Sequence, residues 1–294
     1  MSRIQDILRK AEQDGGVHRT RGLNSPAPAG WHNDAPSTAA AAVIERPSTA
    51  VIERPAVAAR PASSPQPFPT LDPRLVAAHA HTSPAAEQYR SLRTRIKSGE
   101  NGTPLRTIVI TSPNKGDGKS LTAANLALTM AQELQQRVVL VDADLRRPSI
   151  HRLFGVPAAF GLSNVLTEGA AVEDALISVA DHRLTILPAG PIPMHPAELL
   201  GSTAMRRLIE TLRASFDRIL IDMPPAAPLA DVAIASALAD GILVIVRAGV
   251  TKKPAIERAL SGLDQRKVLG LVLNDAGESG AGYYGYDTDG YVAD

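Results

Sequence analysis

The chain has 294 residues, 44% of them hydrophobic, which is enough for one large domain with a buried core. Its 31 basic and 30 acidic side chains leave a formal net charge of +1, and this balance gives no sign of a nucleic-acid-binding surface. The absence of cysteine excludes disulfides, thiolate chemistry and cysteine-based zinc sites, and it fits a reducing compartment.

The start of the chain, MSRIQDILRK, is polar, so we expect no secretory signal. The most apolar stretch, GILVIVRAGV, is interrupted by Arg247 and is too short to cross a bilayer. We therefore expect a cytoplasmic protein without a membrane span of its own. If it works at a membrane, a partner must hold it there.

Residues 1–16 form the first predicted unit. Ile4, Ile7 and Leu8 recur at helical spacing, which predicts a short amphipathic helix over residues 3–13. A fraying tail is the open alternative, because isolated helices of this length are marginal in water.

Residues 17–80 differ in composition from the rest of the chain. Ten of the 23 prolines lie between Pro26 and Pro73, among alanines and serines, and VIERP occurs twice. Such a segment cannot bury enough apolar surface to offset the entropy lost on ordering. We predict a disordered linker, in which the repeated VIERP is either a docking motif or the product of slippage.

Short apolar runs then alternate with amphipathic stretches across a predicted domain of residues 81–275. The expected strands are 107–111, 138–141, 184–187, 219–221, 242–246 and 268–273, and the expected helices are 84–99, 119–134, 196–214, 229–239 and 253–264. Strands that are apolar along their whole length and alternate with helices predict an α/β fold with a mostly parallel sheet covered on both faces. Ligands bind such sheets at the carboxyl ends of the strands.

The segment TIVITSPNKGDGKSLTAANLAL predicts a strand, a glycine loop and a helix. Gly116 and Gly118 allow the backbone to bend around an anion, and the amino-terminal end of the helix favours phosphate. Lys119 would reach the terminal phosphates and Ser120 would bind Mg²⁺. The pattern departs from GxxxxGK[ST] because Pro113 takes the first glycine position, and a bare GKS can also be a surface turn.

Three aspartates follow two other predicted strands. Asp142 and Asp144 end RVVLVDADLRRP, and Asp222 ends FDRILIDMPPA. Carboxylates beside buried strands are costly unless they are paired, and a magnesium–nucleotide complex would pair them. Each aspartate alone could instead be a helix cap or a loop residue, but together behind a phosphate loop they indicate a nucleotide site.

A phosphate loop followed by VVLVDADLR and ILIDMPP resembles the bacterial tyrosine kinases, whose three motifs are called Walker A, A′ and B. This family belongs to the P-loop NTPase branch of MinD and ParA. The resemblance covers residues 84–294 and includes EQYRSLR, which matches the family motif ExxRxxR, and LPAGPIPMHPAELL. The opening MSRIQDILRKA followed by a linker is similar to the variant encoded with exopolysaccharide export systems.

The resemblance implies a role for each matching residue. Lys119, Asp142, Asp144 and Asp222 would be catalytic, with Asp142 as the base for the tyrosine hydroxyl. ATP would contact Lys115, Gly116, Asp117, Gly118, Lys119, Ser120, Leu121, Arg146 and Asn274. The Mg²⁺ ion would be held by Ser120, Asp144 and Asp222. The loop departs from its relatives at Lys115, where proline is common, and at Asn114, where the MinD branch carries its signature lysine.

The last predicted unit, residues 276–294, is a glycine-rich tail. Of the five tyrosines of the chain, four lie in its last 12 residues: Tyr283, Tyr284, Tyr286 and Tyr291. Glycines would keep this tail flexible enough to enter an active site. The family resemblance implies an autophosphorylation cluster that enters the site of a neighbouring chain. The alternative is a sticky tail that happens to contain tyrosine.

Glu87, Arg90 and Arg93 in the ExxRxxR motif lie at steps of three, so they share one face of a helix. The resemblance implies that they join copies of the chain in a homo-oligomeric ring. The alternative is that they pair within their own helix.

Three functions fit the sequence. The first, which the tyrosine cluster favours, is an ATP-dependent tyrosine autokinase that regulates exopolysaccharide assembly and export. The others are a MinD- or ParA-like ATPase switch and a scaffold that only binds nucleotide. The resemblance also implies an activator, a separate membrane chain-length protein that recruits the kinase to the inner face of the membrane.

Overall fold

The computed structural model describes residues 71–100, 102–134, 136–179, 182–226, 232 and 237–276. All of them belong to one compact unit, Pro67–Asp294. The predicted helix 3–13, the VIERP repeats, most of the predicted helix 229–239 and the tail from residue 277 lie outside the described residues.

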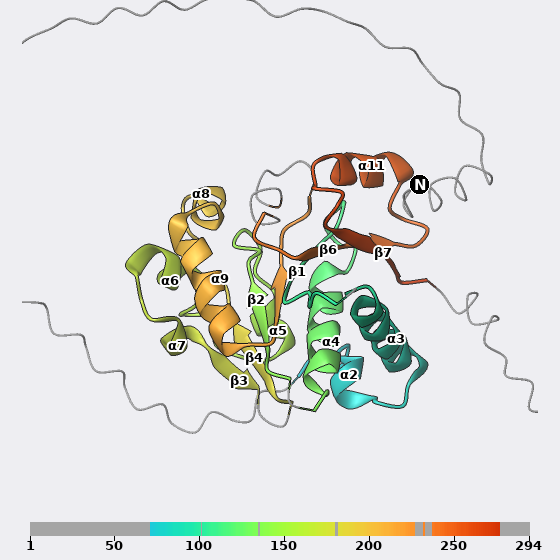
Figure 1. Cartoon of the computed structure of the whole chain (residues 1–294), viewed down its shortest axis with the longest axis horizontal. Helices are drawn as coiled ribbons and strands as arrows, with labels where there is room; N and C mark the ends of the chain where they lie inside the picture. The colour runs from blue at the N-terminus through green and yellow to red at the C-terminus, as the bar shows by residue number, and fades with distance from the viewer. Residues whose placement is uncertain are drawn as a thin grey trace, which may run out of the picture. The chain divides into compact units, whose positions relative to one another are not determined.

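A seven-stranded sheet forms the centre of the unit (Figure 1). Its strands lie in the order β3-β4-β2-β5-β1-β6-β7, and all neighbours are parallel except β3 and β4. The bounds are β1 (Thr107–Thr111), β2 (Val138–Asp142), β3 (Ile177–Val179), β4 (Leu184–Leu187), β5 (Arg218–Asp222), β6 (Gly241–Arg247) and β7 (Val268–Asn274). The predicted α/β fold with a mostly parallel sheet is confirmed.

The helices cover both faces of this sheet (Figure 1). Their bounds are α2 (Val76–His79), α3 (Pro84–Ser98), α4 (Lys119–Ala131), α5 (Ile150–Leu153), α6 (Leu162–Glu168), α7 (Val172–Ala175), α8 (Pro196–Leu200), α9 (Thr203–Ser215) and α11 (Lys253–Ser261). None of the helices in the described residues is both long and apolar enough to cross a bilayer.

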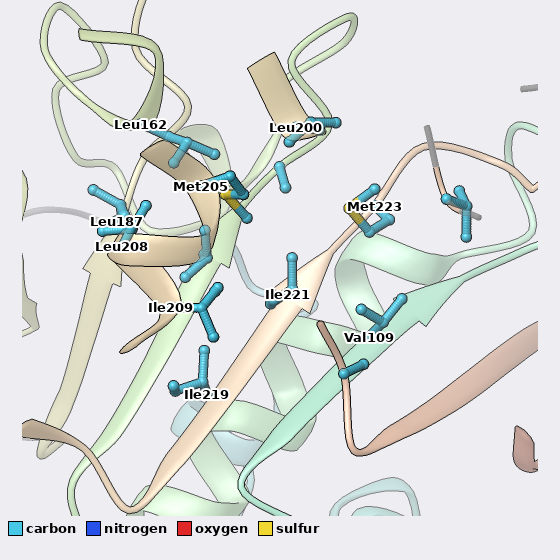
Figure 2. Close-up of a cluster of buried hydrophobic side chains, with 14 of the residues drawn as sticks. Val109, Leu162, Leu187, Leu200, Met205, Leu208, Ile209, Ile219, Ile221 and Met223 are labelled. Atoms are coloured by element: carbon cyan, nitrogen blue, oxygen red, sulfur yellow. The ribbon is translucent and has the colours of Figure 1, made fainter. Parts of the chain in front are cut away.

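Alternate residues of the central strands enter two separate cores, as the period of two in a strand requires. Val109 and Ile221 face one core with Met205 and Leu208 of α9, which Figure 2 shows in close-up. Ile110, whose side chain points to the opposite face of the sheet, packs in a second core with residues of α4, α2 and α5. Because both faces are covered, the central strands are buried along their whole length.

The helix α4 packs across the middle of the sheet, and every residue from Thr122 to Ala131 is buried. Its small residues, such as Ala123 and Ala127, allow it to lie close to the strands. The long helix α3 packs on α4, and α3 begins at Ser83, whose hydroxyl accepts a hydrogen bond from the Ala86 amide. The sheet therefore fixes α4, and α4 in turn fixes α3.

The predicted helix 196–214 is two helices, α8 and α9. The chain breaks at Gly201 and Ser202, and the Ser202 hydroxyl accepts a hydrogen bond from the Met205 amide and starts α9. The prediction was wrong here because the apolar spacing runs through the break, while the serine cap competes with a continuous helix.

The predicted linker extends too far toward the carboxyl terminus. Residues 71–80 are ordered: Leu75 and Ala77 are buried, and Ala77 donates its amide hydrogen to Asn125 Oδ1 at 3.0 Å. The alanine-rich composition resembles the preceding linker, so composition alone could not separate the two. What decides the boundary is a long-range contact with α4.

Two strands also differ from expectation. β3 was not predicted, because it has three residues and lies at the edge of the sheet. β7 was predicted as a buried strand, yet it lies at the other edge and leaves Leu269, Leu271 and Leu273 exposed. The run of apolar residues indicates a strand but does not show whether both faces of it are covered.

Candidate functional site

The phosphate loop joins the carboxyl end of β1 to the start of α4, as predicted. Gly116 and Gly118 adopt φ values of +88° and +96°, a backbone region that disfavours residues with a Cβ. Gly118 is the N-cap of α4 and supplies no side-chain acceptor, so the first amides of the helix are available to a ligand. The loop therefore has the geometry of an anion site.

Asp117 holds this loop from within. Its carboxylate accepts hydrogen bonds from the Asn114 amide and from the Thr251 hydroxyl, both at 2.8 Å. Its carbonyl oxygen accepts a hydrogen bond from the Asn274 side-chain amide at 3.0 Å. Asp117 is buried and does not line the cavity described below. Its side chain is engaged within the chain, where it holds the shape of the loop.

Lys119, the first residue of α4, lies among the predicted acids. Its Nζ atom is 2.8 Å from Asp144 Oδ2, 3.5 Å from Asp222 Oδ1 and 3.0 Å from Ser120 Oγ. Burial lowers the pKa of this ammonium group, but the charges of Asp222 and Asp144 outweigh burial and leave the pKa above its ordinary value. Lys119 is therefore a permanent cation at this site.

Asp142 and Asp222 end two neighbouring strands and are direct partners in the parallel register of β2 and β5. Both are fully buried. Burial first, and then the charge of Asp222, raise the pKa of Asp142 to about 7, and burial also raises the pKa of Asp222. A further cation bound between these two carboxyl groups would favour their ionised forms.

These acids have free acceptor capacity. Neither carboxylate oxygen of Asp222 accepts a hydrogen bond among the described residues, and neither does Asp142 Oδ1. Asp142 Oδ2, by contrast, accepts hydrogen bonds from the Ser149 and Ile150 amides at 2.9 and 3.0 Å. Apart from the contact of Asp222 Oδ1 with Lys119 at 3.5 Å, these buried oxygens are not compensated, which is costly, so the site fits a cation that would coordinate them.

The donor set fits Mg²⁺ better than a cation held by protein ligands alone. The described residues contain no group of three or more histidine, aspartate or glutamate side chains arranged to hold a metal ion. Mg²⁺ usually takes one or two carboxylates and completes its shell with phosphate and water oxygens. Asp144, Asp222 and the Ser120 hydroxyl are hard oxygen donors of that kind, and they lie beside the phosphate loop.

A cavity of about 840 Å³ opens at this edge of the sheet. It is lined by Asp144, a predicted metal ligand, and by most of the predicted nucleotide contacts: Lys115, Gly116, Gly118, Lys119, Ser120, Leu121 and Arg146. Sequence reasoning missed other residues of the lining, namely Arg147, Pro148, Ser149, Arg152, Ile192, Pro224 and Pro225. Several of them adjoin the recognised motifs, and this proximity is the signal that could have found them.

Asn274, a predicted nucleotide contact, does not line the cavity. Its side-chain amide nitrogen packs against Gly118, where an added Cβ atom would lie 2.0 Å away. The Asn274 side chain therefore contacts the backbone of the loop, through the Asp117 carbonyl oxygen. Thr251, which sequence reasoning did not single out, serves the same loop through Asp117.

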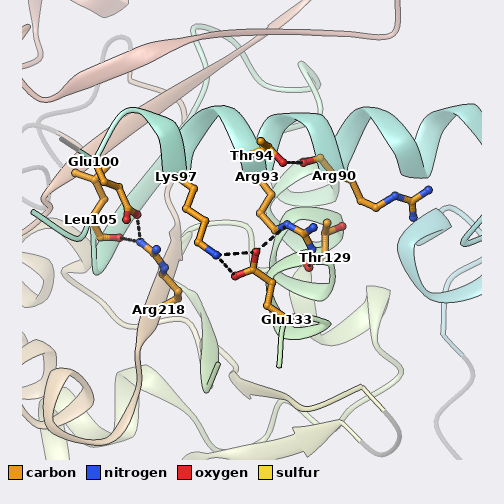
Figure 3. Close-up of polar contacts among 9 residues, drawn as sticks. All are labelled: Arg90, Arg93, Thr94, Lys97, Glu100, Leu105, Thr129, Glu133 and Arg218. Carbon is orange, nitrogen blue, oxygen red and sulfur yellow. Dashed lines mark hydrogen bonds and ion pairs between the residues drawn. The ribbon is translucent and has the colours of Figure 1, made fainter. Parts of the chain in front are cut away.

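The ExxRxxR residues divide into two groups. Glu87 and Arg90 pair within α3, with Arg90 Nε 2.7 Å from Glu87 Oε2, and the Glu87 side chain is 66% exposed. Arg93 instead faces α4, as Figure 3 shows: its Nη1 donates to the Thr129 carbonyl at 2.8 Å, and its Nε lies 3.3 Å from Glu133 Oε1. Arg93 is thus engaged within its own chain.

The four predicted acceptor residues, Tyr283, Tyr284, Tyr286 and Tyr291, lie outside the described residues.

The comparisons with known proteins first define a class. A family model described as ParA, NUBPL iron-transfer P-loop NTPase, matches residues 105–277, which is more than half of the chain. The chain therefore belongs to the ParA-type P-loop NTPases, a nucleotide-binding class. The matched range contains the phosphate loop and the three aspartates at or just after the ends of β2 and β5.

Relatives then define the family within that class. Tyrosine-protein kinase YwqD of Bacillus subtilis strain 168 is 37% identical over 203 residues, which cover 68% of this chain and 85% of the relative. The kinase domain of the Escherichia coli tyrosine kinase ETK matches with a TM-score of 0.65 and 28% identity, over 69% of this chain and 80% of that structure. The chain belongs to the bacterial tyrosine-protein kinases, as its motifs predicted.

A third relative is longer. Tyrosine-protein kinase wzc of Salmonella typhimurium strain LT2 is 32% identical over 225 residues, which cover 75% of this chain but only 31% of the relative. The family therefore contains members in which the region shared with this chain is joined to a much larger polypeptide.

Proposed function

We propose that this protein is an ATP-dependent protein tyrosine autokinase that regulates exopolysaccharide polymerisation and export. The observation that carries the proposal is the cluster of Lys119, Asp144 and Asp222 at the mouth of the phosphate loop, with both Asp222 oxygens free of hydrogen bonds among the described residues. The relatives are named as tyrosine kinases, which supports the same reaction for this chain.

The phosphate loop would hold the triphosphate of ATP. The amides at the start of α4 would bind its oxygens, and Lys119 would exchange its contacts with Asp144 and Asp222 for contacts with the terminal phosphates. Mg²⁺ would be held by Ser120, Asp144 and Asp222, and when bound it would neutralise charge on the phosphates. Arg146, which lines the same cavity, would support the phosphates.

The acceptor is a tyrosine hydroxyl. In the reaction its oxygen forms a bond to the γ-phosphorus while the bond from that phosphorus to the β-phosphate oxygen breaks, and ADP leaves. The phenol proton needs an acceptor, and Asp142 Oδ1 accepts no hydrogen bond among the described residues. With a pKa of about 7, Asp142 is suited to act as a base near neutral pH.

We assign the acceptor role to Tyr283, Tyr284, Tyr286 and Tyr291, each tail entering the site of a neighbouring copy. The exposed Glu87 side chain, 66% accessible, supports a contact between copies, while Arg90 is half-buried and also donates to the His81 carbonyl oxygen at 2.7 Å. Arg93 would contribute indirectly, by fixing α3 on α4. Phosphates added to several tyrosines would expel the acidic tail and loosen a ring by charge repulsion.

The activator would be a separate membrane chain-length protein that recruits the kinase to the inner face of the membrane. The length of wzc supports this partner. Most of wzc lies outside the region that it shares with this chain, and a separate protein would supply the corresponding part here. The test is binding between this protein and the cytoplasmic part of such a protein, with the rate of autophosphorylation as the second readout.

The kinase proposal is tested by labelling the full chain with radioactive ATP and Mg²⁺. The wild type should acquire phosphotyrosine, and Lys119→Ala and Asp142→Ala should not. Replacing the four tail tyrosines with phenylalanine should remove the label while ATP binding persists. Strong labelling of that quadruple variant would reject the tail as the acceptor.

The alternative function is an ATPase switch of the MinD or ParA kind without kinase activity. The same experiment separates the two. A switch would release inorganic phosphate from ATP and leave no phosphotyrosine on the chain. The relatives named as tyrosine-protein kinases do not favour this alternative.

A further inference from the structure

The cavity beside the phosphate loop is more basic than a nucleotide site requires. Five of its lining residues are cationic, namely Lys115, Lys119, Arg146, Arg147 and Arg152, and the only acid in the lining is Asp144. Asp144 already pairs with Lys119 at 2.8 Å. The lining therefore presents several positive charges beyond the lysine that serves the phosphates.

Arg147 and Arg152 are the two cations of the lining that have no role in the proposed binding of ATP. Both are exposed, both line the cavity, and neither forms an ion pair within the described part of the chain. Both guanidinium groups line the same cavity, and guanidinium groups favour carboxylate and phosphate oxygens, so the cavity suits an acidic ligand.

The backbone that carries these arginines is held firmly. The Arg147 amide donates to Asp144 Oδ1 at 3.1 Å. Arg152 lies on the short helix α5, whose first residue, Ile150, is fully buried and donates its amide hydrogen to Asp142 Oδ2 at 3.0 Å. Both arginines therefore extend from backbone that is hydrogen-bonded to Asp142, at the carboxyl end of β2, or to Asp144, two residues after it.

The same cavity also offers apolar surface. Ile192 is 67% exposed and lines the cavity together with Pro224 and Pro225. An exposed isoleucine beside two prolines can pack against an aromatic ring, while the arginines contact an acid next to it. The cavity thus combines the two features that a tyrosine followed by acidic residues would need.

The chain contains such a segment. From residue 276 to residue 294 it has four acids, Glu278, Asp287, Asp289 and Asp294, and neither lysine nor arginine. Asp287 directly follows Tyr286, and Asp289 precedes Tyr291 by two residues. The acceptor segment of the proposed kinase therefore carries the charge opposite to that of the cavity.

We infer that Arg147 and Arg152 form an acceptor subsite that recognises acidic residues next to the tyrosine to be phosphorylated. The substrate class of this kinase is then acidic tyrosine peptides, of which its own tail is one. The inference rests on the proposed kinase function and adds the groups that select the acceptor.

The test uses the full chain with its four tail tyrosines changed to phenylalanine, and a synthetic peptide of residues 280–294 as the acceptor. Arg147→Gln and Arg152→Gln should each raise the KM for the peptide about two- to fivefold, the range expected for one exposed charge pair, and the double variant should raise it further. A peptide in which Asp287 and Asp289 are asparagine should show the same loss with the parent enzyme. The arginine variants should no longer distinguish the two peptides.

Reversing the charge on the enzyme and on the peptide tests the subsite more strictly. Arg152→Glu should weaken the natural peptide strongly, and lysine in place of Asp287 and Asp289 should restore part of the lost affinity. Arg207→Gln is the matched control, because Arg207 is exposed on α9, lies outside the cavity and forms no ion pair among the described residues. Its KM for the peptide should equal that of the parent.

The outcomes separate the subsite from the kinase function. If the parent phosphorylates neither peptide and the unmodified chain does not phosphorylate its own tail, the kinase proposal fails. If it phosphorylates the acidic and the asparagine peptides equally well, the kinase stands and the subsite is rejected. A rise confined to the KM for ATP in the arginine variants would also reject the subsite, because both arginines would then be nucleotide ligands.

Discussion

The side-chain amide nitrogen of Asn274 lies 2.0 Å from the position that a Cβ atom on Gly118 would occupy, and it donates a hydrogen bond to the carbonyl oxygen of Asp117 at 3.0 Å. The last residue of β7 therefore supports the loop that would bind phosphate. Since the tail begins two residues later, the strand that precedes the proposed acceptor segment also shapes the phosphate loop.

The first prediction concerns the two glycines of this loop. Gly116→Ala should cost about 1–2 kcal/mol, because alanine disfavours a positive φ but would meet no atom within 4 Å. Gly118→Ala should cost more and should also weaken ATP binding, because its methyl group would displace Asn274. Thermal melts and calorimetric titration with ATP and Mg²⁺ measure both effects. Equal behaviour of the two variants would contradict the supporting role of Asn274.

The second prediction concerns Thr251. Thr251→Val removes the hydroxyl that donates to Asp117 Oδ1 and accepts from the Arg247 amide, which should destabilise the chain by about 1–3 kcal/mol and raise the KM for ATP. Thr251→Ser keeps the hydroxyl and should restore both values. The control is Thr211→Val, whose exposed hydroxyl bonds only within its own helix. A valine variant with an unchanged KM would show that the loop does not depend on this contact.

The third prediction concerns pH. The pKa of Asp142 is about 7 in the folded chain and 3.8 ordinarily, so between these values the folded chain binds a proton that the unfolded chain does not. The contribution of Asp142 to the free energy of unfolding is therefore full below 3.8 and is lost as pH rises to about 7. Without nucleotide, stability should fall across this window, and the slope should be smaller in Asp142→Asn.

The control for the pH experiment has the opposite sign. Hydrogen bonds from Arg137 hold the pKa of Asp217 below its ordinary value, so its contribution is present above the unfolded pKa and is lost only as pH falls. Asp217→Asn should leave the slope between 3.8 and about 7 unchanged. A wild-type stability that rises across that window would contradict the assignment to Asp142.

The fourth prediction separates two roles within ExxRxxR. Arg93→Ala should lower stability by about 1–3 kcal/mol, because Arg93 bonds the Thr129 carbonyl and pairs with Glu133. Glu87→Ala should leave the melting temperature unchanged, since its pair with Arg90 is exposed, yet it should dissociate any oligomer. Melting and light scattering provide the two readouts. Loss of stability in Glu87→Ala without a change of assembly would contradict the division.

The central strands and α4 could be predicted from the sequence because their signals are local. The strand Val138–Asp142 is apolar at every position before Asp142, and the glycine loop before Lys119 fixes the start of α4. The order of residues 71–80 could not be predicted, because it depends on contacts with Asn125 and Leu153, which lie far along the chain. Local composition carries no information about such partners.

The same distinction applies to the site. Lys119, Asp144 and Asp222 were expected together because each follows a strand or the phosphate loop, and parallel strands place these ends at one edge. Thr251 was not foreseen, because no motif marks a hydroxyl that reaches Asp117 across 134 residues of sequence. The observed position of Asn274 likewise depends on the pairing of β7 with β6, which brings the end of β7 to the loop.

The most direct test of the central claim is the fate of the terminal phosphate of ATP. Purified full chain, first treated with phosphatase, is incubated with ATP and Mg²⁺, and its intact mass is measured beside that of Lys119→Ala. We expect stepwise additions of one phosphate each to the wild type, located on tail tyrosines by fragmentation, and none to the variant. ATP consumed with release of inorganic phosphate, and no phosphotyrosine on the chain, would contradict it.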